Sequence, residues 1–419
     1  MKNRTKEEKI DLYLPIICAL VYVASYFGRH SYNSNITQIR EALGMSYTES
    51  GLVTTFFFFA YGAGQFIHGI FCRRYNEKFV IPAVLLISSV INLSVFCGID
   101  FVFYKYLWLI NGILLSVLWP MLIRVLAKYL ASKSLSKATI LMAGSATAGY
   151  CFTYLASSIF AAIGSYQFSF FFASVVLVCM AVIWMISYVK LDLGKMGVRI
   201  NQEKTDKTIE PSKATNLPEK NSAFIFLIVC MSIYCIFNNT IKDGLHTWVP
   251  SILMSKFDLP GSLSTFLSIT LSVFGLFASM LSVKLNDKIK HYMLESELLF
   301  AITACLIAVT IGLLETSHLI LTLICLGVMA LLMHTACSVM TSIAPLELRD
   351  RVDAGVLAGV LNGFCYVGSI ISSYGLGIIA DNFGWTAVFY FLFSLAIIPG
   401  VVLLVRCGIK LSKRIFKTK

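Results

Sequence analysis

The chain consists mainly of long apolar runs, each long enough to cross a lipid bilayer as a helix. A spanning helix needs roughly 20 apolar residues, and twelve such runs lie between clusters of charged and turn-forming residues. Only 13% of the residues are charged and 58% are hydrophobic, whereas a soluble domain carries about 25% charged residues. The ten-residue alternation typical of an outer-membrane barrel does not occur in the sequence. The sequence therefore predicts an all-α membrane protein with twelve transmembrane helices.

The predicted spans form two sets of six, separated by a polar segment. That segment, 191–221, is rich in Lys, Glu, Asp, Thr and Pro, and such a composition does not bury enough apolar surface to fold alone. We predict an N-terminal six-helix bundle over 1–190, a cytoplasmic linker over 191–221 and a C-terminal six-helix bundle over 222–419. The spans are 13–36, 48–72, 79–99, 104–126, 138–163, 167–190, 223–254, 262–285, 293–314, 318–343, 353–380 and 385–406.

Lysine and arginine residues are concentrated on one side of this topology. With a cytoplasmic N-terminus, all but six of the 34 fall in cytoplasmic segments, as the positive-inside rule requires. Both termini are therefore predicted to be cytoplasmic, and short external loops favour the inner (cytoplasmic) membrane. The net charge of +12 is assigned to topology and anionic lipid, not to nucleic acid. The six exceptions are Arg40, Lys105 and Lys256 outside, and Arg29, Arg124 and Lys242 within spans.

The two halves share a pattern of charges. Arg29 precedes Arg73 and Arg74 by 44 and 45 positions, and Lys242 precedes Asp287 and Lys288 by 45 and 46. In each half, a cation late in the leading helix is followed by a second span and a charged cytoplasmic turn. This spacing predicts an internal repeat, and repeat-built transporters place their substrate site near the membrane midplane.

The cations within the leading helices are the candidate site. An ionised side chain at the centre of a span costs about 2.5–3.5 kcal/mol on insertion scales, so it marks function by default. Arg29 and Lys242 each lie in a stripe of polar residues at helical spacing, which favours positions facing a central cavity. Two alternatives stay open: both cations reach to the outer headgroups, or Lys242 pairs with Asp243. The stripes are Tyr22, Ser25, Tyr26, Arg29, Tyr32 and Asn33, and Tyr234, Asn238, Lys242 and His246.

The scarcity of acidic residues favours an anionic substrate. Apart from Asp243, we expect no Asp or Glu deep in a span, and only His30, His246 and His334 could replace a carboxylate in a proton relay. Arginine binds phosphate or carboxylate in a bidentate manner and lysine supplies a point charge. A doubly charged phosphate ester would neutralise both cations, which suggests exchange of one anion for another.

Two further patterns predict local structure. Pro120, after Trp119, should kink the fourth span because proline removes a backbone hydrogen bond. A run of small residues in the eleventh span should allow close helix packing: Gly368, Ser369, Ser372, Ser373, Gly375 and Gly377. The twelve cysteines contain no CxxC pair and are expected to be small apolar side chains, without a metal site.

Several segments resemble the major facilitator superfamily, and specifically its organophosphate:phosphate antiporters. The resemblance covers nearly the whole chain. It rests on the segments 26–30 (YFGRH), 60–69 (AYGAGQFIHG), 111–112 (NG), 119–120 (WP) with Arg124, 248–250 (WVP), 361–368 (LNGFCYVG) and 381–385 (DNFGW).

The resemblance implies that one cation from each half binds the substrate phosphate. Arg29 matches the first-helix arginine of the family, and Lys242 stands where the family usually has a second arginine. Gln65 replaces a second-helix lysine and Ala146 a fifth-helix histidine, which puts a glycerol-phosphate substrate in doubt. Arg73 replaces the aspartate usual in the cytoplasmic turn motif. With the polar stripes, this gives the substrate-binding candidates Arg29, Lys242, Tyr32, Gln65, Asn238, His246 and Tyr366, and the gating candidates Arg73, Arg74, Arg124, Asp287 and Lys288.

We therefore expect a monomeric secondary transporter without cofactors that exchanges a phosphate ester for inorganic phosphate by alternating access. One alternative is an ion-coupled symporter of a carboxylate or sugar acid. Another is a non-transporting sugar-phosphate receptor that signals through a partner kinase. An enzyme is not expected, because the loops hold no nucleophile–base set, phosphate loop or metal cluster.

Overall fold

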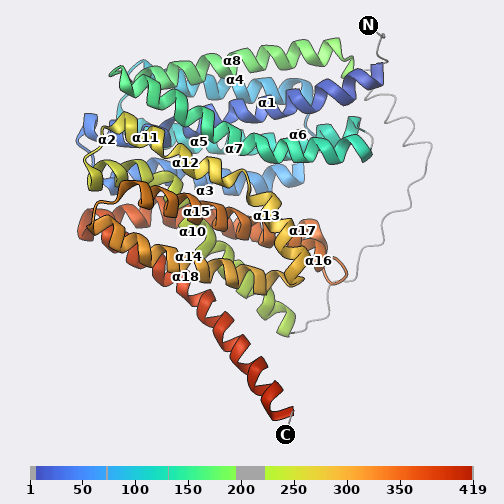
Figure 1. Ribbon diagram of the computed structural model, residues 1–419. Coiled ribbons are helices and arrows are strands. Elements are labelled where there is room, and N and C mark those ends of the chain that lie inside the picture. The colour runs from blue at the N-terminus through green and yellow to red at the C-terminus, as the bar shows by residue number, and fades with distance from the viewer. Residues whose placement is uncertain (1–5, 72–73, 131, 195–221, 418–419) are drawn as a thin grey trace, which may run out of the picture. The chain divides into compact units, whose positions relative to one another are not determined.

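All regular structure in the described part of the chain is helical (Figure 1). The structure, a computed structural model, describes residues 6–71, 74–130, 132–194 and 222–417. Each of the twelve predicted spans coincides with one helix or with consecutive helices in these residues, so the predicted fold class is confirmed. Residues 195–221 of the predicted linker lie outside the described residues.

In the described residues up to Lys190, the first six spans and their connections contain nine helical elements, and the fourth span consists of two of them. Their bounds are α1 (Lys6–Ser34), α2 (Ile36–Leu43), α3 (Tyr47–Phe71), α4 (Glu77–Phe96), the 3-10 helix η2 (Phe101–Phe103), α5 (Tyr104–Ser116), α6 (Leu118–Tyr129), α7 (Ser132–Ala162) and α8 (Gln167–Lys190).

The last six spans are more interrupted. The eighth is divided into three helices, and two π-helices, η3 and η4, follow α15 and α17. A left-handed backbone at Gly384 (φ 77°) separates the eleventh from the twelfth span within α18. The bounds are α10 (Ser222–Phe257), α11 (Gly261–Leu267), α12 (Ile269–Gly275), α13 (Ala278–Ile289), α14 (Tyr292–Glu315), α15 (Leu319–Ser338), η3 (Val339–Ile343), α16 (Ala344–Glu347), α17 (Ala354–Ile370), η4 (Ile371–Gly375) and α18 (Leu376–Lys417).

Ten helical segments of the described residues are long and apolar enough to cross a membrane. The segment Ala354–Val405 contains the turn at Gly384 and therefore includes two predicted spans. Helix α7, which is rich in Ala, Gly, Ser and Thr, is not one of the ten.

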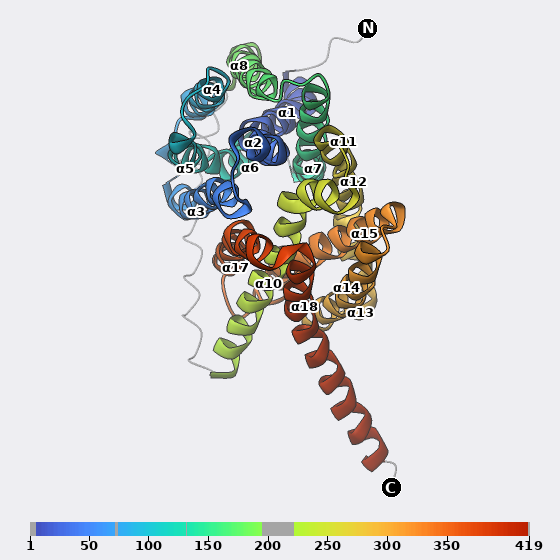
Figure 2. The same ribbon diagram turned by 90° about the vertical axis from the view of Figure 1, so that its left-hand side faces the viewer.

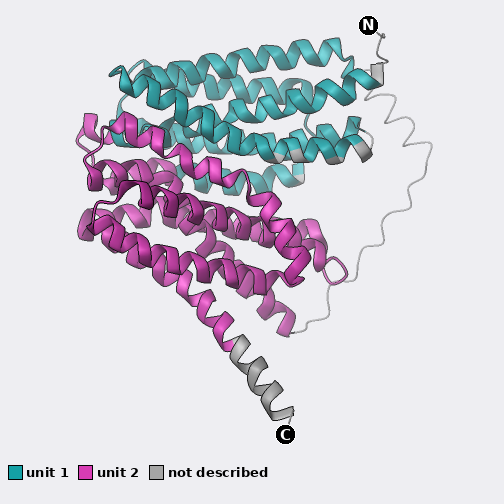
Figure 3. Cartoon of the chain, viewed as in Figure 1, with its two compact units in different colours: residues 1–39, 56–214 teal, residues 40–55, 215–419 magenta. Residues whose placement is uncertain are grey.

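The chain divides into two compact units, each with its own helix packing (Figure 3). Unit 1 comprises Met1–Ile39 and Phe56–Ala214, and unit 2 comprises Arg40–Thr55 and Thr215–Lys419. Within unit 1, α1 packs on α7 and α4 packs on α8; within unit 2, α10 packs on α17 and α14 packs on α18 (Figures 1 and 2). In both units the first span thus packs on the fifth and the third on the sixth, as the internal repeat predicts.

Proline breaks the fourth span, as predicted. Helix α5 ends at Ser116 and α6 begins at Leu118. Pro120 has no N–H to donate to the Ser116 carbonyl four residues earlier, and its ring clashes with that carbonyl. The Ser116 hydroxyl turns back instead and donates to the Ile113 carbonyl at 2.6 Å.

Hydrogen bonds to the backbone fix α1 next to Arg29. The Gly28 carbonyl accepts from the side-chain amides of Asn92 on α4 (3.1 Å) and Asn111 on α5 (2.9 Å). The Ser31 hydroxyl donates to Asn92 at 2.6 Å. Each of these side chains is almost fully buried. Because an unmade hydrogen bond is costly in a buried position, these contacts hold α1 in a fixed position next to Arg29.

The start of α3 belongs to unit 2 because it is capped there. Asp381 on α18 accepts from the backbone N–H groups of Tyr47 (2.9 Å) and Thr48 (2.7 Å). A carboxylate at a helix N-terminus satisfies otherwise unpaired donors. The Tyr47 ring also packs against Trp248 and Trp385, with ring centroids 5.9 Å and 4.8 Å apart.

Helices α10 and α17 approach closely at Gly368. A Cβ atom there would overlap the Ile236 carbonyl oxygen and lie 3.0 Å from the Asn239 Cβ. The close packing predicted for the small residues of the eleventh span is therefore present at this position.

Replacing Gly368 should destabilise unit 2. Alanine normally stabilises a helix relative to glycine by about 1 kcal/mol, but in Gly368→Ala the overlap with α10 should reverse the sign and cost about 1–3 kcal/mol. Gly359→Ala is the matched control, because it lies on the same helix with no atom within 4 Å of its Cβ position. Thermal unfolding of the purified variants should show a lower midpoint for Gly368→Ala only; equal midpoints would contradict the packing argument.

Candidate functional site

Arg29 lies in a group of aromatic rings in unit 1, here named the Arg29 ring group: Tyr26, Phe57 and Tyr61. Its guanidinium carbon is 4.4 Å from the ring centroid of Tyr26, 4.9 Å from that of Tyr61 and 5.8 Å from that of Phe57. All three distances fall within the range of cation–π attraction, about 6 Å. The residue is 9% exposed, so the cation is held in a largely dry, aromatic environment.

No carboxylate of the described residues lies within ion-pair distance of Arg29. Its Nε donates to His30 Nε2 at 2.9 Å. A buried arginine is usually paired with an acid, because burying a charge alone is expensive. The Arg29 guanidinium within its ring group is therefore chemically suited to bind an anion from outside the protein.

The other two candidates in unit 1 lie near this group in sequence but differ in their contacts. Tyr32 is fully buried, and its ring packs on Trp108 (5.5 Å) and Tyr104 (6.4 Å) of α5. Gln65 is half-buried on α3, one helical turn beyond Tyr61. Tyr32 thus contributes to helix packing, whereas Gln65 has the spacing to share a helix face with the ring group.

Lys242 forms an ion pair with its neighbour in unit 2. Its Nζ lies 3.4 Å from Asp243 Oδ1, with side-chain exposures of 13% and 10%, and it also contacts Cys337 Sγ at 3.9 Å. Of the alternatives left open by the sequence, the ion pair is the one that the structure contains. Lys242 and Asp243 together carry no net charge, unlike Arg29.

Hydrogen bonds hold Asp243 in place. Its Oδ2 accepts a short hydrogen bond from the Ser369 hydroxyl of α17 and a second one, at 3.3 Å, from Asn239 Nδ2. Asn239 also donates to Ser369 Oγ at 3.3 Å. Asp243 is thus held beside Lys242 by its own helix and by α17.

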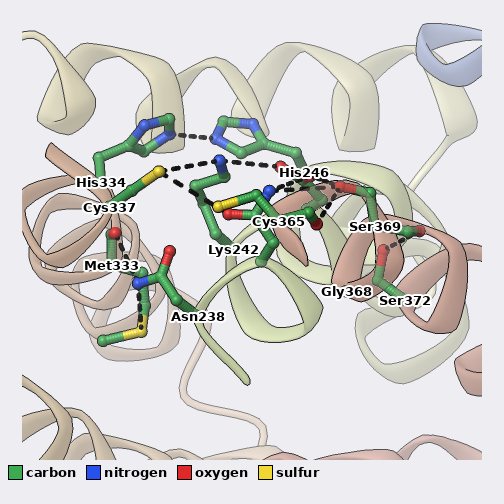
Figure 4. Close-up of polar contacts among 12 residues, drawn as sticks. Asn238, Lys242, His246, Met333, His334, Cys337, Cys365, Gly368, Ser369 and Ser372 are labelled. Carbon is green, nitrogen blue, oxygen red and sulfur yellow. Dashed lines mark hydrogen bonds and ion pairs between the residues drawn. The ribbon is translucent and has the colours of Figure 1, made fainter. Parts of the chain in front are cut away.

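A histidine pair lies one turn farther along α10. His246 Nε2 and His334 Nε2 of α15 are 3.0 Å apart, so one ring donates and the other accepts (Figure 4). His246 is buried and His334 is half-buried. We name the Lys242 cluster by its members: Lys242, Asp243, His246, His334, Cys337 and Ser369.

The remaining candidates of unit 2 lie on the same helices. Asn238 is 2% exposed and its Nδ2 donates to the Met333 carbonyl of α15 at 2.8 Å. Tyr366 is half-buried on α17. Asn238 thus joins α10 to α15 one turn before Lys242, on the same face of α10 as the cluster.

The gating candidates that the structure describes differ in their exposure. Arg124 is half-buried and its Nη1 donates to the Tyr75 carbonyl at 3.2 Å. Arg74 is exposed, with its guanidinium 5.5 Å from the Phe71 ring centroid. Asp287 and Lys288 are exposed near the end of α13. Arg73 lies outside the described residues.

Two buried acids at the start of α14 were not singled out by the sequence analysis. Glu295 and Glu297, in the first two turns of α14, are both fully buried. The Tyr234 hydroxyl, part of the predicted polar stripe of α10, lies 3.5 Å from Glu297 Oε1. Both acids lie near the start of this span, next to a charged turn in the sequence.

Comparison with known proteins decides the family. The sequence model of the family described as Major Facilitator Superfamily matches residues 18–352 of this chain. The chain belongs to the Major Facilitator Superfamily. It is a multi-pass membrane protein and a secondary transporter of a small substrate, and the expectation of a transporter instead of an enzyme is confirmed.

The relatives of this superfamily member are distant. Over 406 residues it is 20% identical to a probable hexose phosphate transport protein of Chlamydia trachomatis, a match covering 92% of this chain and 88% of the relative. The resemblance to the organophosphate:phosphate antiporters is thereby confirmed as distant, full-length homology. A shorter match, 28% identical over 93 residues, links 22% of this chain to 21% of the membrane sensor protein UhpC of Escherichia coli.

Solved structures show the same fold. A bacterial homologue of the human lysosomal transporter Spinster, in an inward-facing and occupied conformation, matches with a TM-score of 0.71 at 14% identity, over 95% of this chain and 97% of the other. A D-xylose–proton symporter matches with a TM-score of 0.71 at 11% identity, over 94% and 96%.

Several residues of the two sites were not among the substrate-binding candidates from sequence. Tyr61 could have been found from its spacing of four before Gln65 on α3. His334 and Cys337 are spaced as neighbours on one helix face, but nothing in the sequence pairs that face with α10. Ser369 was interpreted as a packing residue, and its bond to Asp243 requires the approach of α17 at Gly368.

Breaking the buried ion pair should destabilise the protein. Asp243→Asn leaves Lys242 without its anion, which costs about 3 kcal/mol for a buried pair, and Lys242→Met in the same chain should recover part of the loss. Asp350→Asn is the matched control, since the Arg349–Asp350 pair is 74% and 91% exposed and such pairs contribute little. Thermal unfolding should rank Asp243→Asn lowest; a midpoint equal to that of the control would show that Lys242 is not dependent on Asp243.

Proposed function

We propose that this protein exchanges a phosphate ester for inorganic phosphate by alternating access. The observation that carries the proposal is Arg29, a buried guanidinium surrounded by aromatic rings and without a carboxylate partner in the described residues. Arginine can bind two phosphate oxygens at once, and the tyrosine rings exclude water, which strengthens the attraction.

Two further observations support this assignment. The distant full-length relatives include proteins described as probable hexose phosphate transport proteins. The distribution of basic residues favours a protein of the inner (cytoplasmic) membrane with both termini in the cytoplasm. In this proposal Lys242 supplies a point charge in unit 2, and Tyr32 supports α1 by its packing. Hydrogen-bonding groups for the ester come from four residues: Gln65, Asn238, His246 and Tyr366. Arg73, Arg74, Arg124, Asp287 and Lys288 act in gating.

The test is phosphate exchange in reconstituted liposomes. Wild-type protein in phosphate-loaded liposomes should take up labelled phosphate, and Arg29→Gln should lower the rate by about 10- to 100-fold, the value of one or two charge-assisted hydrogen bonds. Arg29→Lys should be intermediate, because it keeps the charge but not the planar fork.

The control is Arg349→Gln, which removes an exposed arginine with the same change in net charge. It should exchange phosphate at the wild-type rate. Uptake in Arg29→Gln equal to that of this control would remove Arg29 from the substrate site.

A second candidate is an ion-coupled symporter of a carboxylate or sugar acid. The neutral Lys242–Asp243 pair favours it, because a singly charged substrate would need only Arg29. Uptake that collapses with a protonophore, and does not require internal phosphate, would select this function.

A third candidate is a sugar-phosphate receptor that does not transport. The short match to membrane sensor protein UhpC supports it. Phosphate binding without any exchange, at the protein density used for transport, would select it.

A further inference from the structure

The Lys242 cluster lacks the charge that a phosphate dianion needs. Lys242 and Asp243 cancel, and Asp243 is held by Ser369 and Asn239. In the described residues around the cluster, the only other side chains able to gain a positive charge are His246 and His334. The affinity for an anion beside Lys242 therefore increases most if one of these two histidines also binds a proton.

The geometry of the two histidines suits such a proton. In the neutral pair, one Nε2–H donates to the other Nε2 across 3.0 Å. A proton from water can add to the Nδ1 lone pair of the donating ring, giving an imidazolium whose Nε2–H still donates to the neutral ring. That bond is charge-assisted and about twice as strong as the neutral one, so α10 and α15 stay joined in both states.

The neighbours of the pair act on this proton in different directions. Lys242 on α10 disfavours it at both rings, and Asp243 favours it at His246. Helix α15 adds the Cys337 thiol one turn from His334, and α12 places Gly275, without a side chain, against the His334 ring. His334 is half-buried.

We propose that the His246–His334 pair is a proton-binding site linked to anion binding at Lys242. Loading the pair changes the net charge of the Lys242 cluster from zero to plus one. Binding linkage is reciprocal, so an anion favours the proton and the proton favours the anion equally. Anion affinity therefore rises as the pH falls and the pair takes up its proton. This inference rests on the proposed function for its ligand, a phosphate.

The test measures the affinity of the purified full chain for inorganic phosphate at a series of pH values, from acidic to mildly alkaline. Wild type should bind roughly tenfold more tightly at the acidic end than His334→Gln, within the usual range of coupling, and the two should converge at the alkaline end. Glutamine keeps a hydrogen-bonding group near His246 but does not titrate. The control is His318→Gln, an exposed histidine at the start of the same helix, which should follow wild type.

The titration of phosphate itself is common to all three proteins, so the difference between them isolates the proton of the pair. An identical pH profile in wild type and His334→Gln overturns the inference and leaves the proposed function intact. Failure of wild type to bind phosphate at any pH overturns the proposed function, and this inference with it.

A second measurement serves if His334→Gln does not fold. Calorimetry of phosphate binding to wild type, in two buffers of different ionisation heat, counts the protons taken up by the complex. Uptake beyond that of phosphate alone is the expected result, and no excess uptake overturns the proposal.

Discussion

Inside a bilayer, each backbone N–H and C=O must find its partner within the protein, because lipid offers none. That requirement makes the spans helical and makes each interruption a place where other groups compensate. At the fourth span, Pro120 costs one backbone bond, and the helix divides beside Ser116. At the start of α3, the first N–H groups are satisfied by Asp381. The irregular positions are therefore explained by identifiable chemistry.

The same low-dielectric surroundings determine how the two span-embedded cations behave. Arg29 is stabilised by aromatic faces and by His30, which spread its charge without neutralising it. Lys242 has a full countercharge 3.4 Å away. Two positions equivalent in the repeat thus differ in electrostatics: one presents a net positive charge and the other a neutral, hydrogen-bonded pair.

The sequence was sufficient to predict the twelve spans, the repeat, the break at Pro120 and the two cations, since all of these depend on hydropathy, spacing or residue type along one helix. Contacts between helices could not be predicted from the sequence. The hydrogen bond between His246 and His334 joins residues 88 positions apart. The pairing of Lys242 with Asp243, instead of with an external anion, depends on the hydrogen bond from Ser369, which is 126 positions from Asp243. The buried acids of α14 were missed because their burial depends on neighbours in other helices.

The π-helices η3 and η4 come directly after the helices that carry His334, Cys337 and Ser369. A π-turn accommodates one residue more than an α-turn, and such bulges are frequent at functional sites. If one of them were to wind into an α-turn, the part of the helix beyond it would rotate by about 100° relative to the part before it, since an α-helix turns once every 3.6 residues. A change of this kind at either segment would turn one end of the span relative to the lipid, while the other end kept its register.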